Sequence, residues 1–283
     1  MKKLQIFILL FIFLFSNYAN IFIRCNKTLN PSAATDNDRL EKIKEKGVLT
    51  IVSANSPPFC YLDPDTGSIT GIDGDIITEV AKRLGVNKVE MKITIFDELF
   101  TRLLEDDEID CVVSGAFDTP ERRKLVNFTT PWYKSYEIFV VPKLSNIQFK
   151  EDLKDKIMGI QAGTVDQPYA EKQKEQGLIK DLVLFPDQIT LLNDVNFSKI
   201  PVGMSDALTF SYITNKYTRL HLRALIDIPI KGEAAAALRY EDTTLVNAMN
   251  EKINDMKRDK TFNKIIKKYG LDEKNIVPPP PYF

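Results

Sequence analysis

The segment from residue 109 to residue 122 reads IDCVVSGAFDTPER. Its apolar part, Asp110 to Ser114, is typical of a short buried strand, and Gly115 ends the apolar run. Residues Pro120 to Leu125 then favour a helical turn. A strand followed by a polar connection and a turn is one unit of an alternating α/β pattern.

The residues before this segment repeat the unit. The predicted elements are a helix over 38–46 that Gly47 stops, a strand over 48–52, a helix over 73–84, a strand over 88–95 and a helix over 97–105. Short apolar strands that alternate with amphipathic helices predict a mostly parallel sheet with helices on both faces.

The same pattern restarts after about residue 150. The predicted strands cover 157–161, 182–185 and 202–205, and the predicted helices cover 165–176 and 189–196. Two such units in one chain suggest two lobes with a cleft between them. Two further helices, Thr243 to Lys257 and Lys260 to Lys268, each carry an apolar face and need a surface to cover.

The first residues indicate export. Lys2 and Lys3 precede an apolar run from Leu4 to Phe15, which is the form of a secretory signal peptide. An uncleaved anchor is the alternative, because apolar residues resume at 21–23 and about 20 apolar residues span a bilayer. Cys25 is a candidate lipid-attachment site, and residues 32–34 (SAA) offer ordinary cleavage. We assign 1–25 to the signal peptide or anchor and 26–37 to a tether.

Composition and charge narrow the class of partner. Apolar residues make up 44% of the 283 residues and charged residues 27%, as in an ordinary globular protein. Loss of residues 1–25 removes three cations and no anion, so the net charge moves from −1 to −4. This argues against nucleic acid as a partner, which needs a concentrated basic surface. Beyond residue 25, Cys60 and Cys111 form no metal-type pattern.

Several short blocks now stand together in order. They are GVLTI (47–51), PPF (57–59), GIDGD (71–75), IDCVVSG (109–115), TPER (119–122), DLK (152–154), GIQAGT (159–164) and TFNKII (261–266). With this order and spacing, residues 38–272 resemble the periplasmic amino-acid-binding proteins of ABC importers, the family 3 solute-binding proteins.

That resemblance implies a periplasmic-binding-protein-like α/β fold of two lobes, with a ligand cleft and two hinge crossings. Lobe one would comprise 38–134 plus 231–272, lobe two 135–230, and an extended tail 273–283. The expected function is extracytoplasmic: the protein captures a small amino-acid-like ligand by hinge closure and delivers it to an ABC permease. We expect a periplasmic or extracellular monomer, either free or tethered to the membrane by its N-terminus, with no cofactor and no metal.

The resemblance also implies site residues. Arg122 would grip the ligand carboxylate with its planar fork, helped by donors at Ser114, Gly115 and Thr119. The competing interpretation of Arg122 is a solvated helix arginine. Phe96 would form an aromatic wall, or it could equally belong to the core.

The second lobe would supply two more contacts. Thr164 lies at a predicted helix start, where free N–H groups favour an anion, and an N-cap role can coexist with this. Asp206 follows a strand and would hold the ligand ammonium, with a plain helix cap as the alternative. Departures at Ser56, Phe117, Pro201 and 234–237 (AAAA) indicate a reshaped pocket, so the ligand side chain is not readable.

The sequence contains few of the motifs that indicate an enzyme. The sequence has one histidine, His221, and it has no P-loop, dinucleotide fingerprint or zinc-protease motif. It therefore offers no recognisable set of catalytic residues. The cyclohexadienyl (prephenate/arogenate) dehydratases share the fold, however, and FPDQIT (185–190), MSDA (204–207) and GEA (232–234) look like their segments. In that case Glu233 would be the candidate acid. A sensor or receptor domain is a third possibility.

Overall fold

The computed structural model describes residues 38–225, 228 and 230–279. The predicted export segment, Cys25 and the tether lie outside the described residues, as do residues 280–283 of the predicted tail. Within the described part, no helix has both the length and the apolar character needed to cross a membrane.

The first sheet has five strands in the order β4-β1-β5-β13-β6. Their bounds are Lys88–Ile93 (β4), Val48–Ser53 (β1), Cys111–Val112 (β5), Ala237–Leu238 (β13) and Asn127–Phe128 (β6). Strand β1 is parallel to β4 and β5, whereas β13 is antiparallel to both of its neighbours. The sheet is therefore mixed, with the predicted strands forming its parallel half.

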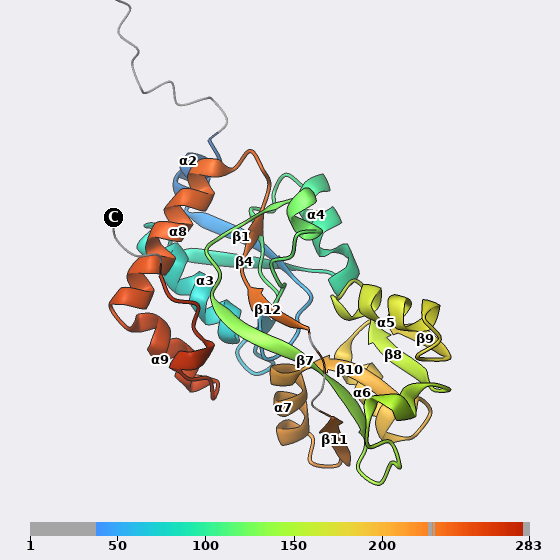
Figure 1. The fold of residues 1–283 in the computed structure, drawn as a ribbon. Helices are drawn as coiled ribbons and strands as arrows, with labels where there is room; N and C mark the ends of the chain where they lie inside the picture. Colours follow the sequence, from blue (N-terminus) through green and yellow to red (C-terminus); the bar gives the residue numbers. More distant parts are fainter. Residues whose placement is uncertain (1–37, 226–227, 229, 280–283) are drawn as a thin grey trace, which may run out of the picture. The chain divides into compact units, whose positions relative to one another are not determined.

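Helices cover both faces of this sheet (Figure 1). Successive side chains of a strand point to opposite faces, and accordingly Leu49 and Ile51 belong to one apolar cluster and Val52 to another. The first cluster contains residues of α2 (Arg39–Lys46), α3 (Ile72–Arg83), α8 (Thr243–Arg258) and α9 (Thr261–Lys268). The second contains residues of α4 (Leu99–Glu105). The C-terminal helices thus cover the first sheet, not the second.

The second sheet has the order β11-β7-β10-β8-β9. Its strands are Leu222–Leu225 (β11), Tyr133–Pro142 (β7), Val202–Asp206 (β10), Ile157–Gln161 (β8) and Asp181–Phe185 (β9). The strands predicted from sequence, β8, β9 and β10, are again the parallel part. Helix α5 (Asp166–Glu175) packs in one apolar cluster, and α6 (Gln188–Asn196) and α7 (Ala207–Lys216) pack in another.

Strand β7 connects the two sheets, and the sequence pattern did not predict it. Its residues 133–136 pair with β12 (Lys231–Ala234), and its residues 137–142 pair with β10 and β11. Next to β12, the N–H of Ala235 donates to the carbonyl of Ala116, which joins this strand to the first sheet. The β7–β12 ribbon therefore carries the chain between the sheets in both directions (Figure 1).

Smaller elements complete the described chain. They are the hairpin β2 (Tyr61–Leu62) and β3 (Ile69–Thr70) and the 3₁₀ turns η1 (Phe96–Glu98), η2 (Arg122–Lys124), η3 (Lys150–Leu153) and η4 (Glu273–Asn275). The segment expected to be an extended tail differs from that picture, because Ile276 bridges to Tyr133 and the N–H of Val277 donates to Trp132. Cys60 and Cys111 are free and buried.

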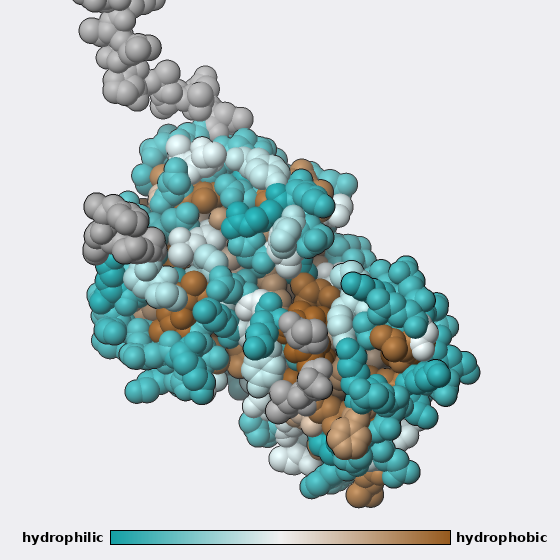
Figure 2. Space-filling view, in the orientation of Figure 1, coloured by the Kyte–Doolittle hydropathy of each residue, from teal (hydrophilic) through white to brown (hydrophobic). Residues whose placement is uncertain are grey.

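Most of the visible surface is hydrophilic (Figure 2). Apolar residues gather near the middle of that face, in the region where Figure 1 shows β7 and β12. Elsewhere, large apolar side chains such as Leu144, Phe149 and Phe197 are exposed singly, which is common on folded proteins.

A buried carboxylate ties β7 to the first sheet. Asp73, near the start of α3, is 1% exposed and accepts hydrogen bonds from the Tyr133 hydroxyl (2.7 Å) and the Gly115 N–H (2.6 Å). Burial raises the pKa of Asp73 to about 6, and these two donors oppose the rise. The carboxylate therefore depends on both donors to stay ionised in the interior.

Replacement of Tyr133 by phenylalanine should lower the free energy of unfolding by about 1.5–3 kcal/mol at pH 7, because a buried carboxylate loses a donor. Urea denaturation measures the change. Tyr136→Phe is the control, since Tyr136 lies on the same strand with a side chain 40% exposed. Equal stability of the two variants would contradict the role of the Asp73 network.

Candidate ligand-binding site

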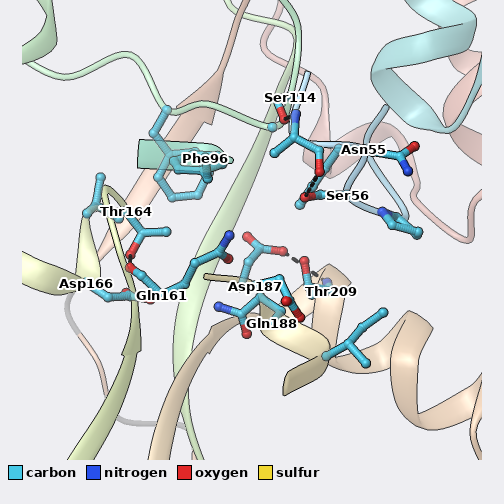
Figure 3. Close-up of a pocket in the computed structure, with 18 of the residues that line it drawn as sticks. Asn55, Ser56, Phe96, Ser114, Gln161, Thr164, Asp166, Asp187, Gln188 and Thr209 are labelled. Carbon is cyan, nitrogen blue, oxygen red and sulfur yellow. Dashed lines mark hydrogen bonds between the residues drawn. The ribbon is translucent and has the colours of Figure 1, made fainter. Parts of the chain in front are cut away.

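A cavity of about 400 Å³ lies between residues that follow the strands of both sheets (Figure 3). It is lined by 54–57, 59, 96, 114, 115, 117, 122, 137, 161, 164–166, 187–190, 206, 209 and 213. Figure 3 shows Ser56 and Ser114 across the cavity from Gln161 and Gln188. Many of these residues come just after β1, β5, β8, β9 and β10, as expected for ligand sites of open α/β sheets. The volume suits a small organic molecule.

The structure brings six of the seven predicted site residues to this cavity. They are Phe96, Ser114, Gly115, Arg122, Thr164 and Asp206. Thr119 is not among the lining residues; its hydroxyl accepts the backbone N–H of Arg122 at 3.2 Å. The geometry of Thr119 therefore supports the turn that carries Arg122, and the binding roles of the other six stay predictions.

Arg122 is held by contacts from both sides of the cavity. Its Nη1 donates to the carbonyl of Phe117 (2.8 Å) and its Nη2 to the carbonyl of Gly163 (3.1 Å). Its guanidinium carbon lies 5.7 Å from the ring centroid of Phe96 and 5.2 Å from that of Phe100. Loss of solvent lowers the pKa of Arg122 to about 10, so the group stays cationic at neutral pH. The solvated-helix interpretation does not fit this setting.

Ser114 and Gly115 are already engaged by the protein. The Ser114 hydroxyl accepts the N–H of Ala54 at 3.0 Å and also contacts the Ser53 hydroxyl at 3.3 Å. The Gly115 N–H, by contrast, donates to Asp73. Gly115 has φ +68°, and a Cβ there would lie 2.6 Å from the ring of Phe59, so glycine is needed at this close approach.

Thr164 precedes helix α5. Its hydroxyl donates to the carbonyl of Gln161 at 2.8 Å, and its carbonyl accepts the N–H of Gln167. Val165, not Thr164, is the N-cap residue of the helix. The first helical residue is Asp166, whose side chain brings a carboxylate to the end where an anion was predicted.

Asp206 caps a helix and also lines the cavity. One carboxylate oxygen, Oδ1, accepts the N–H groups of Leu208 (2.8 Å) and Thr209 (3.3 Å) and so caps α7. The other, Oδ2, accepts the hydroxyl of Ser135. Burial raises the pKa of Asp206 to about 6. The helix cap is therefore present at a residue that also lines the cavity.

Two carboxyl groups of the cavity were missed by sequence reasoning. Glu137 lies on β7 with 5% exposure and Asp166 on α5 with 1%. Oε2 of Glu137 and Oδ1 of Asp166 have no partner outside this pair, and the two carboxyl groups lie within hydrogen-bonding reach of each other, which holds the proton on Glu137. Burial, followed by the negative charges of Asp166 and Asp206, raises the pKa of Glu137 well above its usual value. Burial likewise raises the pKa of Asp166 to about 7.

Other polar groups of the lining were also not predicted. Asn55, Gln161 and Gln188 bring side-chain amides, and Asp187 accepts the N–H and hydroxyl of Thr190 as the cap of α6. Asp166 could have been predicted to line the cavity, because it lies two residues after Thr164 in the sequence. No comparable signal existed for Glu137, because its strand was not predicted.

The departures from the family pattern fall partly on the cavity. Ser56 and Phe117 line it, whereas Pro201 does not. The alanines at 234–237 are buried in the two apolar clusters that flank the first sheet, and Ala234 bridges to Phe117. Ser56 and Phe117 therefore alter the walls directly, and the alanines support one of them.

Glu233, the candidate acid of the dehydratase alternative, does not line the cavity. Its side chain is 42% exposed, and its Oε1 lies 3.9 Å from the Nζ of Lys134. This arrangement corresponds to a surface residue at a crossing between the sheets.

The family model of the bacterial extracellular solute-binding proteins, family 3, matches residues 48–272. The chain belongs to this family. The resemblance and the α/β fold inferred from the sequence blocks are thereby confirmed, and the prediction of a solute-binding protein with them.

Named relatives share most of their length with this chain. The L-cystine-binding protein TcyJ of Escherichia coli is 29% identical over 84% of this chain and 88% of its own length. The arginine-binding extracellular protein ArtP of Bacillus subtilis is 25% identical over 86% and 93%. Both relatives are named as binding proteins.

Solved structures agree with the fold. An ABC uptake transporter substrate binding protein from Streptococcus pneumoniae with bound histidine is 26% identical, with a TM-score of 0.78 over 84% of this chain and 98% of that one. The ancestral amino acid-binding protein AncCDT-1, described as a precursor of cyclohexadienyl dehydratase, is 27% identical, with a TM-score of 0.71 over 82% and 99%.

The raised pKa values of Glu137 and Asp166 make the ligand-free protein less stable as pH rises. Because the pKa of Asp166 is raised to about 7, the native state binds more protons than the unfolded state between about pH 4 and pH 7, and the raised pKa of Glu137 acts in the same direction. The free energy of unfolding falls through that window. In the double variant Glu137→Gln/Asp166→Asn, the loss between pH 5 and pH 8 should be smaller by about 1 kcal/mol or more.

Urea denaturation at the two pH values tests this expectation. Asp259→Asn is the control, because the pKa of Asp259 is lowered to about 2 and its titration lies below the tested range. An unchanged difference between pH 5 and pH 8 in the double variant would show that the pair does not carry the extra protons.

Proposed function

We propose that the protein captures an amino acid in the cavity and delivers it to an ABC importer. One observation carries this proposal: Arg122 and Asp206 line the same cavity of about 400 Å³. A zwitterion needs a cation for its carboxylate and an anion for its ammonium, and this pair offers both. The names of the relatives, which bind cystine, arginine and histidine, support the same ligand class.

The proposed motion is closure of two lobes about the β7–β12 ribbon. Lobe one would comprise 38–134 plus 231–272 and lobe two 135–230. The ribbon is the part of the described chain where pairing changes from one sheet to the other. The bond from Arg122 to the carbonyl of Gly163 joins residues of the two proposed lobes and would favour the closed arrangement.

The proposed setting is outside the cytoplasm, as for the family. The importer's permease would be the protein partner, and we propose a monomer that is either free or tethered by its N-terminal segment. Binding without chemical conversion is part of the proposal.

A second candidate function rests on the likeness to AncCDT-1. Under that function the protein would dehydrate a cyclohexadienyl substrate with a carboxyl group as the acid. The exposed position of Glu233, away from the cavity lining, favours binding over this reaction.

The ligand class is tested with Arg122→Ala. A thermal-shift screen of the amino acids first selects the ligand that most raises the melting temperature, because a ligand specific to the native state stabilises it. Calorimetric titration of that ligand should show a loss of about 1.5–3 kcal/mol of affinity in the variant, the scale of a lost charged hydrogen bond. Arg123→Ala is the control, because Arg123 pairs with Asp118 and is not part of the lining.

Equal affinity of Arg122→Ala and the unchanged protein would contradict the assigned carboxylate contact. Prephenate and arogenate are included in the same screen, with their consumption followed over time. Turnover of either that Glu233→Gln abolishes would replace the transport function with the dehydratase function.

A further inference from the structure

The ionisable groups of the cavity are unbalanced. One guanidinium, that of Arg122, faces four carboxyl groups: Glu137, Asp166, Asp187 and Asp206. No lysine or histidine of the described chain lines the cavity. A zwitterionic ligand adds one carboxylate and one ammonium, so it leaves the excess of negative groups unchanged.

Two of the four carboxyl groups have an assigned partner. Asp206 caps α7 and would hold the ligand ammonium, and Asp187 accepts the N–H (2.8 Å) and the hydroxyl (3.0 Å) of Thr190. Glu137 and Asp166 are left over. Each is more than nine-tenths buried and lines the cavity, and each has a carboxyl oxygen whose only partner is the other group of the pair.

Arg122 attracts both carboxyl groups of the pair electrostatically but donates no hydrogen bond to either. It donates to the carbonyls of Phe117 and Gly163, and the ligand carboxylate would claim further donors. A buried pair of carboxyl groups that shares one proton still carries one negative charge, which costs folding free energy, whereas a cation beside the pair would be bound strongly. Among the described residues, no three His, Cys, Asp or Glu side chains are arranged to hold a metal ion. An organic cation therefore fits the pair better than a metal.

We propose that Glu137 and Asp166 form a second cation subsite, and that the ligand is an amino acid with a cationic side chain. This inference rests on the proposed function. The ligand carboxylate would lie at Arg122, its α-ammonium at Asp206 and its terminal guanidinium or ammonium at the Glu137–Asp166 pair.

The lining also suits the stem of such a ligand. Val165, Ile189 and Ile213 add apolar surface to the cavity, and the methylenes of arginine or lysine pack well against apolar walls. A guanidinium can donate two parallel hydrogen bonds to carboxylates, as its planar fork allows. Cystine fits less well, because its second carboxylate would need a second cation in the lining.

The raised pKa values add an independent readout. In the ligand-free protein the pair retains a proton, under the influence of Arg122 and Asp206, which are the charged groups that act on it. A cationic side chain that enters the subsite would displace that proton. Binding should therefore release about one proton at pH 6.5, as seen by titration in two buffers of different ionisation enthalpy.

The decisive experiment compares arginine, lysine, glutamine and cystine by calorimetric titration of the full chain and of Glu137→Gln and Asp166→Asn. We expect arginine or lysine to bind at least tenfold more tightly than glutamine and cystine. Each substitution should weaken arginine and lysine at least tenfold and leave glutamine within about threefold. Glu171→Gln on the outer face of α5, where the residue is exposed, is the control and should change nothing.

The outcomes separate the inference from the function beneath it. Glutamine or cystine bound as tightly as arginine and lysine would overturn the cationic ligand and leave amino-acid binding intact. If arginine is the preferred ligand and neither substitution weakens its binding, Glu137 and Asp166 do not form the subsite. If the protein binds no amino acid, both the proposed function and this inference are wrong. Retained glutamine binding in the variants excludes misfolding as the cause of lost arginine binding.

Discussion

The pairing of β7 with β12 is the constraint on which the rest of the structure depends. The first residues of β7 pair with β12 beside the first sheet, and its last residues lie inside the second sheet. Because both strands pass between the sheets, the ends of β1 and β5 face the ends of β8, β9 and β10 across one cavity. Asp73 fastens this arrangement by binding both Tyr133 of β7 and Gly115 beside the cavity.

The cavity contains more carboxyl groups than cationic groups, and this excess bears on ligand binding. The buried guanidinium of Arg122 donates to carbonyls from both sides, whereas the carboxyl groups outnumber it and two of them have only each other as partner. Such groups lower the stability of the empty site, and a ligand that pairs with them recovers that free energy on binding. The empty cavity thus has an excess of carboxyl groups, and a ligand with a cationic group compensates for it.

Family membership and ligand identity rest on different residues. The blocks shared with the family include the turn that carries Arg122 and the segment that carries Thr164, which would handle the groups common to all amino acids. Glu137, Ser56 and Phe117 belong to the walls of this particular cavity. This division explains how relatives of similar fold bear names with cystine, arginine and histidine.

The sequence by itself determined the alternation of strands and helices, the family, and the position of Asp206 at the end of a strand. These features follow from local apolar periodicity, turn residues and short motifs, all of which lie within a few residues of each other. Only the tertiary structure decided that β7 runs from its pairing with β12 into the second sheet, because β12 lies about a hundred residues away in sequence. It also decided that Gly115 donates to Asp73, that Thr119 stays outside the lining, and that Glu137 meets Asp166. Burial and long-range strand pairing determine these contacts, and the neighbouring residues in the sequence do not predict either of them.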